Sequence, residues 1–260
     1  MKSVSKIFAI AGVVIKELYR RKDFYVLFVL TAVITLVAGM HRFFNDPNIV
    51  RYAKDLCMLL IWISALVIAI ATTARQIPVE RENRTIFPLL AKPVTRWQVV
   101  VGKFMGSWLA TGVALLVFYI FFGIATGSRE EVSRWPVYFQ AFWLQWVMLG
   151  VVVAITLLGS VVFSAPSANV TICFIAIAGI LFLGGHLNVI ALRNAEPVQS
   201  VICAVYYLIP HLEWFDLRDR LVHGWGRVSW FDCGLATLYA AAYAWLFLLL
   251  TWLVFRRKSL

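Results

Sequence analysis

The sequence predicts an all-α integral membrane protein with six transmembrane helices, an N-terminal interfacial helix, and a re-entrant or interfacial hairpin before the last span. The first observation is composition: 62% of the 260 residues are hydrophobic and only 14% are charged, whereas about a quarter of a soluble domain is charged. The second is the presence of six apolar runs of the length that a membrane-spanning helix needs, roughly 17 to 25 residues. The third is that none of these runs contains Asp, Glu, Lys or Arg.

The six predicted spans are Phe24–Met40, Leu56–Ala74, Phe104–Ala125, Ala141–Phe163, Val170–Ile190 and Cys233–Phe255. The first is at the short end of the range that a spanning helix needs. Asp, Glu, Lys and Arg inside spans mark proton relays and ion-coupling sites, and the absence of these four residue types from the predicted spans argues against a self-powered secondary transporter. No internal repeat or low-complexity linker divides the chain, which predicts a single membrane domain over residues 1–260.

Basic residues are distributed unevenly between the two sides of the predicted membrane. With the N-terminus inside, the inner segments hold 15 of the 24 Lys and Arg residues and carry the whole formal net charge of +11. Because Lys and Arg are retained on the cytoplasmic side, both termini are predicted to be cytoplasmic. The charge thus indicates topology and contact with anionic membrane lipid. A nucleic-acid partner is not expected, since no aromatic-interleaved basic face accompanies the charge.

Two segments outside the predicted spans have patterns of their own. Residues 1–23 are amphipathic and basic, which predicts a cytoplasmic interfacial helix; a simple basic retention signal is the alternative. Residues 191–232 form an outer segment longer than a connection requires. Within it, Val198–Ile209 is apolar but too short to span and lies between Pro197 and Pro210, and a second amphipathic stretch, Glu213–Leu221, follows. We expect these two stretches to pair as a re-entrant hairpin in the outer leaflet.

The predicted cytoplasmic loop, residues 75–103, is the most ordered of the connections. From Val79 to Lys103, seven of 25 residues are ionised. Glu80 and Glu82 are expected to continue the second span as a helix, and Thr95 is expected to cap the helix that enters the third. Between them lies a short apolar element, Ile86, Phe87, Leu89 and Leu90, ended by Pro93. Apolar side chains between charged flanks are typical of a docking surface; a merely solvated loop is the alternative.

At these residues the chain resembles the ABC-2 type permeases, the membrane subunits of one class of ATP-binding-cassette transporters. The family pattern runs from an acidic pair through Thr and paired leucines to Pro, a Thr or Ser with Arg, and Gly-Lys. The matching positions are Glu80 and Glu82, Thr85, Leu89 and Leu90, Pro93, Thr95 with Arg96, and Gly102 with Lys103. The variant is most similar to the permeases of multi-copper enzyme maturation systems. Pro88, inside the short element, departs from the pattern and leaves the boundaries of the docking helix open.

The resemblance implies that the loop is a coupling helix seated in a groove of a P-loop ATPase subunit. The implied ATPase-coupling residues are Glu80, Glu82, Thr85, Ile86, Phe87, Leu89, Leu90, Pro93 and Arg96. The chain has no GxxxxGK[ST] phosphate cradle, so it is expected to be non-catalytic and to bind no cofactor, with ATP and Mg²⁺ on the partner. The implied assembly has two ATPase copies and a second permease copy, and exports a substrate across a prokaryotic cytoplasmic (inner) membrane.

Weaker patterns leave alternatives open. Gly102, Gly106, Ala110 and Ala114 form a small-residue stripe that lets a helix approach closely, either within the subunit or in a dimer. His211, Glu213 and His223 could gather a metal ion, although their spacing is poor for one helix face, and a membrane-embedded metalloenzyme is therefore a second hypothesis. A membrane scaffold without an ATPase is a third. Cys203 and Cys233 could form a disulfide or be small buried side chains.

Overall fold

The computed structural model describes residues 2–20, 29, 33, 47–83, 95–127, 135–223 and 225–258. Every regular element in these ranges is a helix, in agreement with the predicted all-α class. The predicted first span, Phe24–Met40, lies outside the described residues except for Val29 and Val33.

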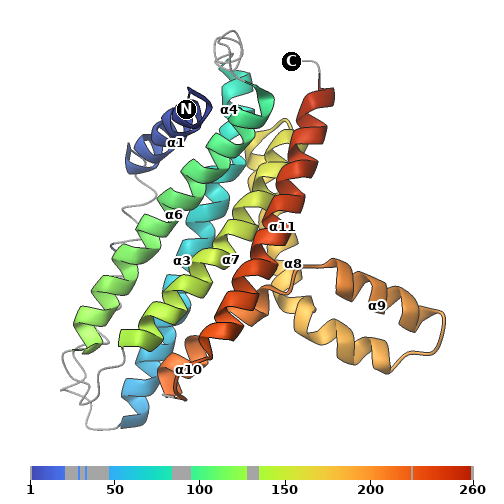
Figure 1. Cartoon of the computed structure of the whole chain (residues 1–260). Coiled ribbons are helices and arrows are strands. Elements are labelled where there is room, and N and C mark those ends of the chain that lie inside the picture. Colours follow the sequence, from blue (N-terminus) through green and yellow to red (C-terminus); the bar gives the residue numbers. More distant parts are fainter. Residues whose placement is uncertain are drawn as a thin grey trace.

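Five helices within the described ranges are long and apolar enough to cross a membrane. They are α3 (Pro47–Ala74), α6 (Arg96–Gly127), α7 (Trp135–Val162), α8 (Pro166–Leu192) and α11 (Trp230–Arg257). They confirm the second to sixth predicted spans and extend beyond most of the predicted limits. In Figure 1, α3, α6, α7 and α11 run side by side, and α7 lies in the middle.

Local sequence signals account for several helix ends. Thr95 and Gln98 form a capping box at the start of α6: the Thr95 N–H donates to Gln98 Oε1 at 3.0 Å, and the Gln98 N–H donates to Thr95 Oγ1 at 3.3 Å. Such a box satisfies two of the N–H groups that a helix start leaves without partners. Pro166 opens α8 directly after α7 ends, as proline favours the first turn. The short connection makes α7 and α8 consecutive and antiparallel (Figure 1).

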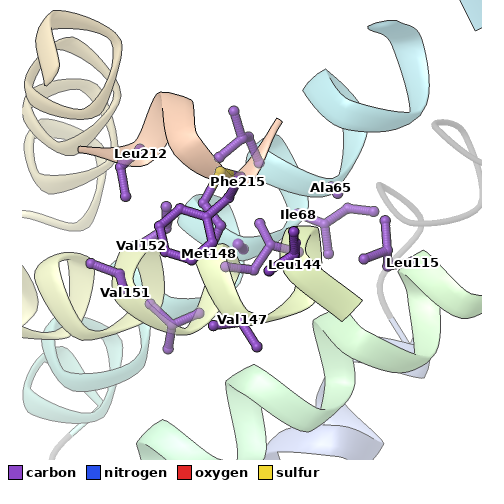
Figure 2. Close-up of a cluster of buried hydrophobic side chains, with 14 of the residues drawn as sticks. Ala65, Ile68, Leu115, Leu144, Val147, Met148, Val151, Val152, Leu212 and Phe215 are labelled. Atoms are coloured by element: carbon purple, nitrogen blue, oxygen red, sulfur yellow. The ribbon is translucent and has the colours of Figure 1, made fainter. Parts of the chain in front are cut away.

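The core of the bundle is built around α7 (Figure 2). Its side chains Leu144, Met148 and Val152 are each at most 2% exposed and meet apolar residues from α3, α6 and the short 3₁₀ helix η2 (Leu212–Phe215). In a bilayer, helices associate through close van der Waals contact because lipid tails are as apolar as the helix faces. The continuous packing on α7 therefore fixes the arrangement of its neighbours.

A reciprocal tryptophan pair joins α6 to α7. Trp108 and Trp146 stack with ring centroids 4.7 Å apart. The Trp108 Nε1–H donates to the Trp146 carbonyl at 2.9 Å, and the Trp146 Nε1–H donates to the Trp108 carbonyl at 3.1 Å. Each indole lies over a glycine of the other helix, Trp146 over Gly112 and Trp108 over Gly150. A WxxxG spacing on both helices thus permits the close crossing.

The N-terminal helix α1 (Lys2–Arg20) lies along the first part of α6 (Figure 1). A Cβ built on Gly102 would lie 2.9 Å from Ile10 Cβ, and one built on Gly106 would lie 2.8 Å from Val14 Cβ and 2.9 Å from Ala11 Cα. The small-residue stripe therefore serves packing within the subunit at these two positions. Ala110 and Ala114, farther along α6, are both buried in the core.

The predicted pairing of Val198–Ile209 with Glu213–Leu221 is wrong. The short helix α9 (Val198–Leu208) lies beside the second half of α8 and projects with it sideways from the bundle (Figure 1). The following η2 and α10 (Arg218–His223) pack instead on the bundle, chiefly against α3, α7 and α8. The reason is burial: Leu212, Phe215 and Leu221 enter the core, whereas α9 buries none of its residues.

Candidate functional site

The candidate site is the end of the bundle that carries the flanks of residues 84–94, referred to here as the α4 end. Of the predicted coupling residues, Glu80, Glu82 and Arg96 are described, and the structure shows their surroundings. The others lie outside the described residues: Thr85, Ile86, Phe87, Leu89, Leu90 and Pro93. In Figure 1 α11 (Trp230–Arg257) ends at this same end of the bundle, which also carries α4 (Gln76–Glu82).

Glu80 and Glu82 do continue the second span, but in a separate short helix after a turn at Arg75. The break has a local cause. Pro78 has no N–H, so it cannot donate to the carbonyl of Ala74 four residues before it. In the structure Asn169 of α8 takes that role: its Nδ2 donates to the Ala74 carbonyl at 2.6 Å, and its side chain is fully buried. The prolyl break in α3–α4 is thus compensated by α8.

Two polar contacts join α4 to α6. Lys103 Nζ lies 2.7 Å from Glu80 Oε1, with the lysine side chain 3% exposed and the glutamate 32%. One turn deeper, Gln76 Nε2 donates to Ser107 Oγ. A buried ammonium group is tolerated only when it is paired, and removing one partner of such a pair is strongly destabilising. The first and last parts of the loop motif, the acidic pair and Gly-Lys, are therefore held together by a partly buried ion pair.

Arg96 is directed at the end of α11. Its Nη1 donates to the carbonyls of Phe255, Arg256 and Lys258 at 2.6, 2.9 and 3.1 Å. Its guanidinium carbon also lies 5.6 Å from the centroid of the buried Phe255 ring. The last carbonyls of a helix lack partners within the helix and carry the negative end of its dipole, so a cation there is favourable. Arg96 thus caps the last helix from the start of α6.

Lys258 makes the corresponding contact one helix further on. Its Nζ donates to the carbonyls of Val161 and Val162, the last residues of α7, at 2.7 and 3.0 Å. Burial, followed by the nearby charge of Arg81, lowers the pKa of Lys258 from its usual value. The α4 end therefore holds a series of helix-end contacts, in which α6 caps α11 and the residue after α11 caps α7.

The alternative metal site is not assembled. His211 is buried between the rings of Tyr206 and Trp214, with Nδ1 3.7 Å from Glu213 Oε1. His223 instead stacks on Trp225. Among the residues that the structure describes, no group of three or more His, Cys, Asp or Glu side chains is placed to hold a metal ion. Cys203 and Cys233 are both free, and Cys233 is buried.

Several residues of the α4 end escaped the sequence reasoning: Gln76, Ser107, Asn169 and Lys258. Pro78 was a usable signal, because a proline in a continued helix leaves a carbonyl to be satisfied elsewhere. Nothing in the sequence indicated that Asn169 would be the donor. Lys258 is one of the basic residues of the predicted inner segments, and the sequence pattern assigns it only to the cytoplasmic side. Its contact with α7 depends on how α11 packs.

The arrangement at the α4 end offers mechanical linkage between helices. The flanks of residues 84–94 are joined to each other by Glu80–Lys103 and Gln76–Ser107. They are joined to the last helix by Arg96. A displacement applied between the flanks would therefore act on α4, α6 and α11 together.

Comparison with known proteins agrees with the loop motif and with the helical architecture. Residues 8–260 match the family model described as ABC-2 family transporter protein. A search of curated proteins finds no match. The family match covers almost the whole chain, including α1, the 75–103 segment and α11. The chain therefore belongs to the ABC-2 family of transporter proteins and is a membrane permease subunit of an ABC transporter.

Proposed function

We propose that this permease subunit couples ATP hydrolysis on a separate P-loop ATPase to the export of a substrate across a prokaryotic cytoplasmic membrane. Residues 84–94, between α4 and α6, are the proposed docking element, with both termini on the ATPase side. In the assembly, two ATPase subunits serve two permease copies. ATP and Mg²⁺ are bound by the ATPase.

The observation that carries this proposal is the bracing of the two flanks of residues 84–94. A solvated loop needs no partly buried Lys103–Glu80 ion pair at its base. A docking element needs such a brace, because a flexible loop would deform under force and would not transmit the displacement to the helices. The apolar side chains Leu89 and Leu90 are the proposed contacts with the ATPase groove, since apolar anchors dominate the energy of protein interfaces.

The test is purification of the tagged permease from native membranes, with identification of bound partners and an ATPase assay. The variant carries Leu89→Asp and Leu90→Asp. Trp225→Asp is the matched control, because it places a carboxylate on an exposed aromatic residue just beyond α10, at the opposite end of the bundle. We expect a P-loop ATPase to accompany the wild type and the control and to be lost from the double variant.

Two results would contradict the proposal at different levels. If the ATPase accompanied all three proteins equally, the docking element would lie elsewhere on the permease. If no ATPase accompanied the wild type in a detergent that preserves its fold, the coupling function would be wrong. A membrane scaffold would then be the better interpretation.

A further inference from the structure

Arg96 and Lys258 connect three helices in series at the α4 end of the bundle. Arg96, the first residue of α6, holds the end of α11 through three carbonyls. Lys258, the residue after α11, holds the end of α7 through two. These two side chains and the five carbonyls are referred to below as the helix-end clasp.

Two ring contacts reinforce the contact that Arg96 makes between α6 and α11. The guanidinium lies over the ring of Phe255, which is fully buried. The neighbouring Trp97 meets Trp252 of α11 edge to face, with ring centroids 6.3 Å apart. Edge-to-face aromatic pairs stabilise a contact beyond the area that they bury. The start of α6 and the end of α11 are thus fixed by a cation and two ring contacts.

The direction of Arg96 is unexpected for a residue of the loop motif. It lies immediately after the segment proposed to dock on the ATPase, yet its bonds run into the permease. Packed helices move as rigid bodies that slide or tilt in small steps. A helix end gripped through its carbonyls therefore follows the residue that grips it.

We propose that the helix-end clasp conveys displacement of the 75–103 segment from the start of α6 to the end of α11 through Arg96, and from the end of α11 to the end of α7 through Lys258. Arg96 is then a positioning residue inside the permease, and not a contact for the ATPase. This inference rests on the proposed function, because the displacement originates at the docked ATPase subunit.

The test uses the complete complex of permease and ATPase, with the four natural cysteines replaced and a single environment-sensitive fluorophore. The fluorophore is placed either at Leu253→Cys on α11 or at Val162→Cys on α7; both side chains are exposed. The change in fluorescence on adding ATP and Mg²⁺ is compared among wild type, Arg96→Gln and Lys258→Met. The matched control is Arg257→Gln, because Arg257 is an exposed basic residue in the last turn of α11, next to Lys258. Arg96→Lys is the conservative variant.

The serial arrangement gives a specific pattern. Arg96→Gln should reduce the ATP-driven signal about fivefold or more at both positions. Lys258→Met should reduce the signal at Val162→Cys and leave the signal at Leu253→Cys unchanged. Arg257→Gln should give the same signal as the wild type. Arg96→Lys should give a signal between those of Arg96→Gln and the wild type. The amount of ATPase that co-purifies should be the same for all variants. A merely structural role would lower the thermal midpoint without this positional pattern.

Four outcomes would overturn the inference. If Arg96→Gln lost the ATPase while Lys258→Met kept it, Arg96 would be a docking contact. If Arg96→Gln and Lys258→Met bound ATPase and kept full signals, or the wild type showed no signal at Leu253→Cys, the clasp would transmit nothing. If no ATPase bound the wild type, the proposed function itself would fail, and the clasp would fail with it.

Discussion

Replacing Gly112 by alanine should weaken the contact between α6 and α7 more than the same replacement at Gly150, the glycine in the corresponding position on α7. A Cβ at this position would lie 2.2 Å from Trp146 Nε1 and 2.8 Å from Cε2. The indole is the obstacle, and its ring is also held by the stack with Trp108. Trp146 must therefore tilt, and its Nε1–H then loses the Trp108 carbonyl.

The expected size of the effect follows from these contacts. Leaving a buried donor without its acceptor costs about 1–3 kcal/mol, and weakening the aromatic stack costs about 0.5–1.5 kcal/mol. The gain from replacing a helical glycine by alanine offsets about 0.5–1 kcal/mol. The free energy of unfolding should therefore fall by about 0.5–4 kcal/mol.

Two further glycines serve as graded controls. A Cβ on Gly150 would lie 3.1 Å from Trp108 Nε1, so Gly150→Ala needs only a small shift of that indole; its cost should stay below about 1 kcal/mol. A Cβ on Gly179 of α8 would meet nothing within 4 Å, and Gly179→Ala should be neutral or slightly stabilising. The expected order of stability is Gly179→Ala, then Gly150→Ala, then Gly112→Ala.

Buried thiols provide the assay. Cys57, Cys173 and Cys233 are at most 4% exposed, so a thiol-reactive fluorogenic dye reports unfolding in detergent once Cys203 is replaced by serine. The Trp146→Phe variant tests the cause, because it removes Nε1, the atom with which the new methyl group of Gly112→Ala would clash. In that background Gly112→Ala should cost at least about 1 kcal/mol less, as expected for contacting residues. Equal stability of all three alanine variants would refute the reasoning.

Two other predictions concern the α4 end. Gly106→Leu should displace α1, because the new side chain would clash with the backbone of Ala11 and with the side chain of Val14. Proteolysis of the N-terminal segment in membranes should therefore accelerate. Gly179→Leu is the control and should leave the rate of proteolysis unchanged. Asn169→Ala should lower the free energy of unfolding by about 1–3 kcal/mol, because it removes the donor to the Ala74 carbonyl and leaves that acceptor buried. Thiol-dye unfolding measures it, and Asn169→Ala as stable as wild type would show that another group satisfies the carbonyl.

The positions of the helices were predictable because a single physical requirement determines them. Backbone groups inside a bilayer must be satisfied within their own segment, so a long uncharged apolar run can only be a helix. The runs that became α3, α6, α7, α8 and α11 met this requirement. The start of α6 was predictable for a similar reason, since the capping residue Thr95 and its partner Gln98 are only three residues apart.

Partners distant in sequence were not predictable. The Val198–Ile209 stretch was expected to pair with its neighbour Glu213–Leu221, but the apolar face of the second stretch finds a larger buried surface on the bundle. The spacing of apolar residues along a helix shows that one face is apolar, but it does not show which element will pack against that face. The choice depends on which complete set of faces packs best.

The coupling segment shows the same division. The sequence by itself determined that residues 75–103 lie between two spans and combine charges, apolar residues and the ABC-2 motif. Only the tertiary structure decided that Lys103 pairs with Glu80, that Asn169 completes the helix broken by Pro78, and that Arg96 caps α11. Composition and local spacing set which segments enter the membrane, because those depend on one helix at a time. The links between helices depend on side chains brought within about 3 Å of each other by packing, a distance that no local pattern encodes.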